Sequence, residues 1–335
     1  MIHMNAIFVD YKVNDEWQFA KILESTKFEN WSVIECQTNH YHGSIIDKFK
    51  RFFWYFVFPL RMIFLRGNFE RIIAWQQFYG LNFAFWSRLF HLRKVNDLTV
   101  MTFIYKKKNG FLGKIYHKYM CFIVKSKYID RFICFSKEES EYYPSLFGVD
   151  KERFVFIPVG ISPIINVPQR DDGYIFATGR SNRDYIFLMS VFNKTTTYKC
   201  KIACDTLTCN STENVTILNN CHGTEMIELM AHCHCVAIPL KDTTISSGQL
   251  VILQAMALGK PVICTDADGI RDYTSAETTI MVPNSIEKWI NAFGILYNEK
   301  DRYEIMCKVS KKTFEERFTN KAMFSNIAKI VYNIV

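Results

Sequence analysis

The sequence predicts an α/β protein of two domains, each built on a parallel sheet covered by helices. Its 335 residues exceed what one hydrophobic core usually organises. Short apolar runs rich in β-branched and aromatic residues alternate with helix-length segments, which is the pattern of repeated βαβ units. The alternation is interrupted at residues 162–172, where two prolines and several turn formers predict a linker.

The first half opens with a βαβ unit. Residues 5–10 and 31–36 predict strands, with a helix at 16–25 between them. No glycine-rich turn follows the first strand, so a dinucleotide-binding fingerprint is absent there. Further strands are predicted at 71–79, 98–105, 131–136 and 154–158, and further helices at 82–92, 114–126 and 137–147.

The second half repeats the alternation. Strands are predicted at 174–178, 199–204, 215–218, 236–240 and 262–263, and helices at 185–191, 224–231, 250–258, 286–297 and 300–317. We therefore predict an N-terminal domain at 1–161, a C-terminal domain at 162–318, and a final amphipathic helix within 319–335 that packs back on the N-terminal domain. Ligands of such sheets bind beyond the carboxyl ends of the strands.

All of the excess positive charge lies in the first half. Residues 1–160 contain 23 Lys and Arg against 15 Asp and Glu, whereas residues 161–335 contain 18 of each. A one-sided basic surface suggests an anionic lipid, an acidic ligand or nucleic acid, and a solvated face without a partner is the alternative. Nucleic acid is disfavoured because the aromatic residues lie in apolar runs rather than between basic residues. Membrane or acceptor contact is predicted for Lys106, Lys107, Lys108, Lys114 and Lys118.

Residues 47–66 are the most hydrophobic part of the chain. The uninterrupted apolar run at 52–60 is too short to span a bilayer. With basic residues on both sides, the segment fits a membrane interface, and a buried domain helix is the alternative. The eleven cysteines come without a signal-peptide pattern. We therefore predict a cytoplasmic protein associated peripherally with the inner face of the cell membrane.

Residues 245–265, ISSGQLVILQAMALGKPVICT, are the most informative stretch for function. They predict a polar loop, a helix, a glycine stop and a strand. At such a helix start the unpaired backbone N–H groups and the positive end of the helix dipole can hold an anion such as a diphosphate.

Two other motifs have metal-like spacing and are predicted not to bind metal. The sequence His232-Cys233-His234-Cys235 is too tightly spaced for separated ligand pairs and leads into an apolar strand. The sequence Asp266-Ala267-Asp268 follows a strand and is interpreted as a loop.

Four segments, in this order, resemble the family 4 glycosyltransferases of the GT-B fold: FICFSKEESEYYPSLFGVDKERFVFIPVGIS, FATGRSNRDY, NCHGTEMIELMAHCHCVAIPL and SSGQLVILQAMALGKPVICT. The resemblance covers residues 128–318. It implies two Rossmann-like domains facing each other across a cleft, with a nucleotide-sugar bound by the C-terminal domain. It implies no cofactor besides this co-substrate, for which a UDP-sugar is favoured.

The resemblance also implies roles for individual residues. Arg180 would face the diphosphate, and Arg183 would either replace a family lysine or pair with Asp184. The family usually has two glutamates eight positions apart, and Ser246 and Gln254 stand in their places, in an SSGQ loop like that of some polysaccharide-assembly branches. The implied donor-binding residues are Arg180, Arg183, Ser246, Ser247, Gly248, Gln249 and Gln254. Arg180 and Ser246 are the candidate catalytic residues, and no base is assigned.

The activity that the resemblance implies is hexosyl transfer from a nucleotide-diphosphate-sugar to a glycan or lipid-linked acceptor in surface polysaccharide synthesis. The missing glutamates leave a second possibility, a catalytically silent protein of the same fold that acts as a binding partner or scaffold. A nucleotide-sugar epimerase or a phosphorylase on the same fold is a third.

Overall fold

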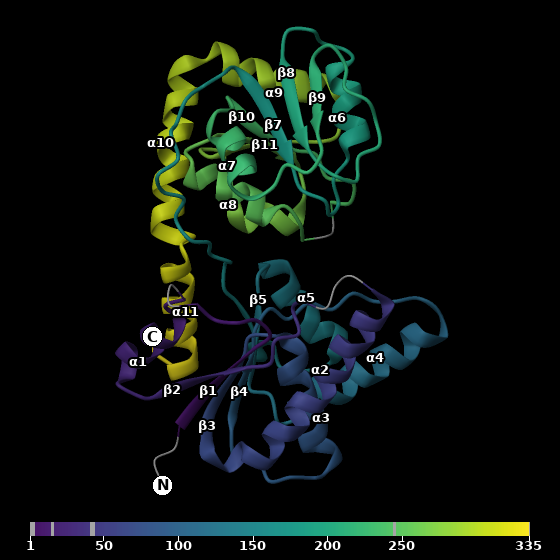
Figure 1. Cartoon of the computed structure of the whole chain (residues 1–335), viewed down its shortest axis with the longest axis vertical. Helices are drawn as coiled ribbons and strands as arrows, with labels where there is room; N and C mark the ends of the chain where they lie inside the picture. The colour runs from purple at the N-terminus through teal and green to yellow at the C-terminus, as the bar shows by residue number, and fades with distance from the viewer. Residues whose placement is uncertain (1–3, 15–16, 41–43, 244–245, 335) are drawn as a thin grey trace. The chain divides into compact units, whose positions relative to one another are not determined.

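The computed structural model describes residues 4–14, 17–40, 44–243 and 246–334. The chain divides into two compact units. Unit 1 comprises Met1–Ile157 with Phe324–Val335, and unit 2 comprises Pro158–Met323. Each unit contains a six-stranded parallel sheet with helices on its faces, so the predicted fold class of two parallel-sheet α/β domains is confirmed (Figure 1).

The sheet of unit 1 has the strand order β2-β1-β3-β4-β5-β6. Its strands are β1 Met4–Val9, β2 Trp31–Glu35, β3 Phe69–Ala74, β4 Asp97–Val100, β5 Arg131–Cys134 and β6 Phe154–Phe156. Its helices are α1 Phe19–Lys27, α2 Ile45–Leu65, α3 Gln77–Leu89, α4 Gly110–Val124 and α5 Lys137–Phe147. The chain steps across the sheet in one direction from β1 to β2 and in the opposite direction from β2 through β6. Since each crossover is right-handed, α1 covers one face of the sheet and α2 to α5 cover the opposite face.

Helix α2 is stabilised by groups that its own sequence and α3 supply. At its start, Ser44 and Asp47 form a capping box. Pro59 lies inside the helix and has no N–H for the carbonyl of Tyr55. The buried Asn82 of α3 donates to that carbonyl at 2.8 Å and so replaces the missing bond. The proline is therefore tolerated because a neighbouring helix satisfies the freed oxygen.

Several predicted strands of unit 1 ended too late, those at 131–136 and 154–158 by two residues and those at 71–79 and 98–105 by five. The strand predicted at 71–79 ends at Ala74, and the side chain of Gln76 accepts from the Phe78 N–H to start α3. The strand predicted at 98–105 ends at Val100, because Thr102 takes a left-handed conformation with φ 50°. Aromatic or β-branched residues continued past the true strand ends in both places, so the sequence pattern did not mark where the strands end.

The sheet of unit 2 has the strand order β12-β11-β10-β7-β8-β9. Its strands are β7 Tyr174–Thr178, β8 Lys199–Ala203, β9 Val215–Leu218, β10 Cys235–Ile238, β11 Val262–Thr265 and β12 Thr279–Val282. Its helices are α6 Tyr185–Phe192, α7 Gly223–Ala231, α8 Gln249–Ala257, α9 Ile286–Asn298 and α10 Lys300–Arg317. Strand β12 was not predicted. The chain order reverses between β7 and β10, so the carboxyl ends of these two strands form a topological switch point, where such sheets bind ligands.

The last helix, α11 Asn320–Tyr332, carries the chain into unit 1. The ring of Phe324 lies 5.0 Å from that of Phe19 on α1. The Tyr332 hydroxyl accepts from Trp31 Nε1 at 2.8 Å and donates to the Leu23 carbonyl at 3.1 Å. These contacts place α11 beside α1 on the same face of the sheet (Figure 1).

Candidate functional site at the switch point of unit 2

Two loops meet at the switch point of unit 2. One follows β7 (residues 179–184), and the other follows β10 and is described at residues 239–243 and 246–248. The Asp184 N–H donates to the Pro239 carbonyl at 2.9 Å. Asn182 donates through Nδ2 to the Asp242 carbonyl at 2.7 Å, and its Oδ1 accepts from the Asp242 N–H at 2.9 Å. The two loops are therefore fixed to each other at the carboxyl edge of the sheet.

Helix α8 begins at this junction. Its N-cap is Gly248, which has φ 105° and provides no side chain to cap the first turn. Asn182 Nδ2 also donates to the Ser247 hydroxyl at 2.9 Å and so holds the residue before this glycine. A helix start without a capping side chain offers its N–H groups and the positive end of its dipole to an anion.

Arg183 lies buried beside this helix start, with 8% of its surface exposed. Its Nε donates to the Thr178 carbonyl at 3.2 Å, and its Nη1 donates to the Ser181 carbonyl at 2.9 Å. A Cβ added at Gly179 would lie 2.7 Å from Arg183 Nη2, and one added at Gly248 would lie 3.9 Å from Nη1. Gly179 thus leaves the space that the guanidinium fills, whereas Gly248 only borders it at an ordinary contact distance.

No carboxylate forms an ion pair with Arg183 in the described part of the chain. Asp184 does not serve this purpose, because its carboxylate accepts from the Phe187 N–H at 3.0 Å and caps α6. Burial lowers the pKa of the Arg183 guanidinium, although an arginine remains charged. A buried cation is normally paired, and an anionic group of a ligand would supply the missing partner.

Arg180 takes a different direction from the same loop. Its Nη2 lies 2.6 Å from Oδ2 of Asp205, which follows β8, and His222 Nε2 lies 3.0 Å from the same oxygen. The N–H of Asn220, together with these two neighbours, lowers the pKa of the Asp205 carboxyl. Contact of Arg180 with a diphosphate at α8 would therefore require it to leave Asp205.

The residues at the positions of the two family glutamates lie on the loop before α8 and within α8. The Ser246 hydroxyl donates to the Gly269 carbonyl at 3.0 Å and accepts from Gln249 Nε2 at 2.6 Å. Gln249 Nε2 also lies 3.2 Å from the Gly269 carbonyl. Gln254 is half-buried on α8. The side chains of Ser246 and Gln249 therefore form a local network that ties the loop to the segment after β11.

The metal-like motifs are occupied by other contacts. Arg271 lies 2.6 Å from Asp266 Oδ1 through Nη2 and 2.9 Å from Asp268 Oδ1 through Nε. His234 Nδ1 lies 2.7 Å from Asp171 Oδ2. Within residues 4–14, 17–40, 44–243 and 246–334, no group of three or more His, Cys, Asp or Glu side chains could hold a metal ion.

The predicted lysines all lie in unit 1. Lys106, Lys107 and Lys108 are exposed in the loop between β4 and α4, and Lys114 and Lys118 are exposed on α4. They form one basic group in the loop before that helix and along its first nine residues. The donor-binding residues implied by the sequence lie instead in unit 2.

Glu139 is a titratable residue that no sequence motif marks. It lies in the first turn of α5, beyond the carboxyl end of β5, and is half-buried. Burial raises the pKa of its carboxyl to about 7, against a smaller lowering by a hydrogen bond with Tyr143. No local motif distinguishes this glutamate from Glu138 beside it, so only burial reveals it.

We expect Glu139→Gln to change how stability depends on pH. The folded-state pKa of about 7 exceeds the unfolded value of about 4.3, so the folded state holds the proton more tightly. The wild type should lose stability as pH rises from about 4 to 7 and remain level above that. The glutamine variant should match it near pH 4 and exceed it by about 1–2 kcal/mol at pH 8, after discounting for partial exposure. Urea unfolding at both pH values measures this, and an equal difference at both would contradict the raised pKa.

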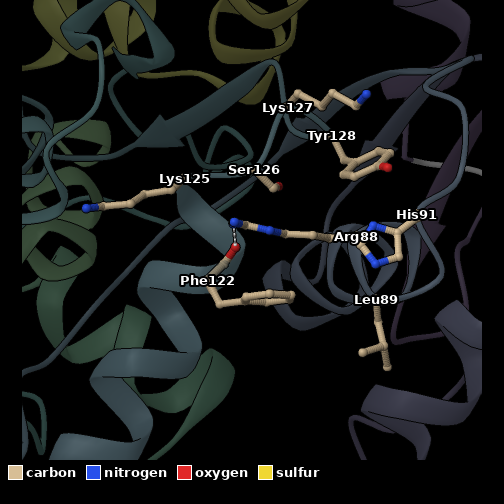
Figure 2. Close-up of a pocket in the computed structure, with 8 residues that line it drawn as sticks. All are labelled: Arg88, Leu89, His91, Phe122, Lys125, Ser126, Lys127 and Tyr128. Carbon is tan, nitrogen blue, oxygen red and sulfur yellow. Dashed lines mark hydrogen bonds between the residues drawn. The ribbon is translucent and has the colours of Figure 1, made fainter.

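Unit 1 also contains a cavity of about 630 Å³ at the carboxyl ends of α3 and α4. Figure 2 shows the residues that line it: Arg88, Leu89, His91, Phe122, Lys125, Ser126, Lys127 and Tyr128. Arg88 Nη1 donates to the Phe122 carbonyl in the last turn of α4. Cations at helix carboxyl ends complement the helix dipole, which accounts for this basic lining. The residues predicted for donor binding or for acceptor contact do not line it.

Comparison with known proteins adds a family match and a fold match. Residues 197–299, which contain β8 to α9, match the family described as glycosyl transferases group 1. No curated protein matches the chain in sequence.

The similar solved structures include Anabaena HepE in complex with UDP, with a TM-score of 0.69 and 12% identity over 98% of this chain and 100% of that chain. Sucrose-phosphate synthase from Thermosynechococcus elongatus gives 0.69 and 13% identity over 99% of each chain. WaaG, a glycosyltransferase involved in lipopolysaccharide biosynthesis, gives 0.62 and 12% identity over 98% of this chain and 99% of that chain. The chain therefore has the fold of the GT-B glycosyltransferases.

Proposed function

We propose that this protein is a metal-independent glycosyltransferase that moves a hexosyl group from a nucleotide-diphosphate-sugar to an acceptor. The observation that carries the proposal is the buried Arg183, which has no carboxylate partner among the described residues and lies beside the uncapped start of α8. The match of residues 197–299 to glycosyl transferases group 1 supports the same activity.

The arrangement suits the charge that develops during sugar transfer. Breaking the bond between the anomeric carbon and the phosphate oxygen leaves negative charge on the diphosphate. A guanidinium and backbone N–H groups that are already in place stabilise this charge without reorganisation. Arg183 can present its fork to phosphate oxygens, and the N–H groups of the first turn of α8 supply the remaining donors. In this proposal the amide of Gln254 contacts the ribose, and a UDP-sugar is favoured because HepE is similar in fold and was crystallised with UDP.

The proposed acceptor is a glycan or a lipid-linked intermediate in surface polysaccharide synthesis. The basic group in unit 1 supports it, as does the similarity in fold to WaaG. Among the described residues, no helix combines the length and the apolar character needed to cross a bilayer. We propose peripheral association with the inner face of the cell membrane.

One observation favours a second function, a catalytically silent scaffold of the same fold. The Ser246 hydroxyl stands where the family has a carboxylate, and it is engaged with Gly269 and Gln249. Such a protein would bind the donor without turning it over.

A thermal-shift panel of UDP-, GDP-, ADP- and CMP-sugars tests the donor proposal. One nucleotide should raise the melting temperature, corresponding to about 2.7 kcal/mol at a donor concentration of 100 times its dissociation constant. Incubating that donor with membrane glycolipid extracts should then release free nucleotide. If no nucleotide stabilises the wild type, the donor proposal fails. Stabilisation without release would favour the scaffold.

A further inference from the structure

We propose that the amino-terminal parts of α2 and α4 form a docking face that inserts apolar side chains into an anionic lipid bilayer surface. This inference rests on the membrane association proposed above and assigns a surface to it. The docking face consists of Ile45, Phe49, Phe52 and Phe53 on α2 and Phe111 and Leu112 on α4. Each of these side chains is between 59% and 77% exposed.

The exposed residues of α2 follow the helical repeat. Ile45, Phe49 and Phe52 are spaced at i, i+4 and i+7 and so lie along one side of the helix. Further along the same helix, Phe58 and Met62 are buried in the core of unit 1. The sequence left two alternatives open for this segment, a buried domain helix and a membrane-interface helix. Helix α2 fits both, because its second half packs in the domain and its first half projects apolar side chains into solvent.

The exposed amino-terminal ends of α2 and α4 lie at about the same height along the face of the sheet. Both helices cover the same face of a parallel sheet and therefore run in the same direction (Figure 1). The ring of Phe56 on α2 lies 6.2 Å from the ring of Tyr119 on α4. Phe49 and Leu112 each precede this contact by seven residues, or about 10 Å along the helix axis. The exposed apolar residues of α2 and those of α4 therefore lie side by side and form one surface.

The charges around the docking face identify its partner. Residues 44–53 and 104–119 contain eight Lys and Arg and a single acid, Asp47, which belongs to the capping box of α2. Lys48 and Lys50 flank Phe49 in sequence and are exposed on α2. Lys114 and Lys118 are exposed on α4, which also carries Phe111. Aromatic side chains with lysines around them match a bilayer that has anionic headgroups over an apolar interior. A second copy of the same face would bring like charges together.

Vesicle flotation with the full chain tests this face. Wild type should float with vesicles of phosphatidylcholine and phosphatidylglycerol and much less with phosphatidylcholine alone. The double variant Phe49→Ser and Phe111→Ser should bind the anionic vesicles at least about tenfold more weakly, because two exposed rings no longer leave water. The matched control is Phe64→Ser, since Phe64 is 81% exposed on α2 but lies beyond the buried part of the helix. This control should bind as wild type does.

Four outcomes would overturn the inference. Absence of wild-type binding to anionic vesicles would contradict both the proposed docking face and the proposed membrane association. If the double variant bound as well as wild type, or if Phe64→Ser lost as much binding as the double variant, the proposed docking face would be wrong and the membrane association would stand. Self-association of wild type that the double variant abolishes would identify a second copy as the occupant. Far-ultraviolet circular dichroism and donor-induced thermal shifts should be the same in all variants, so loss of folding and failure of the donor proposal are scored separately.

Discussion

Arg183→Met should weaken binding of the nucleotide-sugar by about a hundredfold while leaving the ligand-free protein about as stable as wild type. Methionine keeps much of the buried aliphatic volume and removes the charge. A hydrogen bond to a charged group contributes about 1.5–3 kcal/mol, and about 1.4 kcal/mol corresponds to a tenfold change in affinity. Without ligand, the variant loses the bonds to the Thr178 and Ser181 carbonyls but no longer buries an unpaired cation. These two effects oppose each other in the free energy of unfolding.

Arg180→Met is the matched control because it makes the same chemical change in the same loop. Arg180 is exposed and pairs with Asp205, so its loss should weaken donor binding by at most about tenfold. Isothermal titration calorimetry of both variants with the stabilising nucleotide-sugar, together with urea unfolding without ligand, measures the two quantities. A larger loss of affinity in Arg180→Met than in Arg183→Met would assign the diphosphate to the exposed arginine instead.

The difference between these two arginines shows where the sequence stopped being informative. The motif GRSNRD predicts a loop with two cations at a strand end, and the structure contains that loop. Which guanidinium turns inward depends on the space that Gly179 leaves and on Asp205, a residue far from the motif in sequence. Such long-range packing leaves no local pattern.

The fold was predictable because alternation of strand and helix patterns is local. The segments predicted at 174–178, 215–218, 137–147 and 300–317 have the same bounds as β7, β9, α5 and α10. Errors arose where an apolar run continued after a strand ended, as at Thr102, where the backbone turns with φ 50°. Helix α2 is the reverse case, since its continuous apolar sequence conceals an exposed half and a buried half. Exposure along one apolar helix depends on how far its neighbours extend, which periodicity does not encode.

Gly248→Ala should destabilise unit 2 by about 2 kcal/mol and abolish donor binding at concentrations that saturate wild type. Gly248 has φ 105°, a conformation in which an L-residue is strained by about 1–3 kcal/mol. An added Cβ would lie 3.4 Å from Ile238 and 3.9 Å from Arg183 Nη1, so crowding is a smaller cost than the backbone strain. Relief of that strain would change the direction of the first N–H groups of α8, and the proposed anion site needs those groups as well as the guanidinium.

Gly294→Ala separates this effect from a general response to losing a glycine. Gly294 lies within α9, where a Cβ would make ordinary contacts at 3.6 Å with the Tyr198 hydroxyl and at 3.8 Å with Asn298. Alanine is favoured over glycine in a helix by about 0.5–1 kcal/mol, so this variant should be more stable and should bind donor as wild type does. Urea unfolding and calorimetry of the two variants should therefore show stability changes of opposite sign. If Gly248→Ala kept full donor affinity, the start of α8 would not be the diphosphate site, because an anion held by those N–H groups depends on their direction.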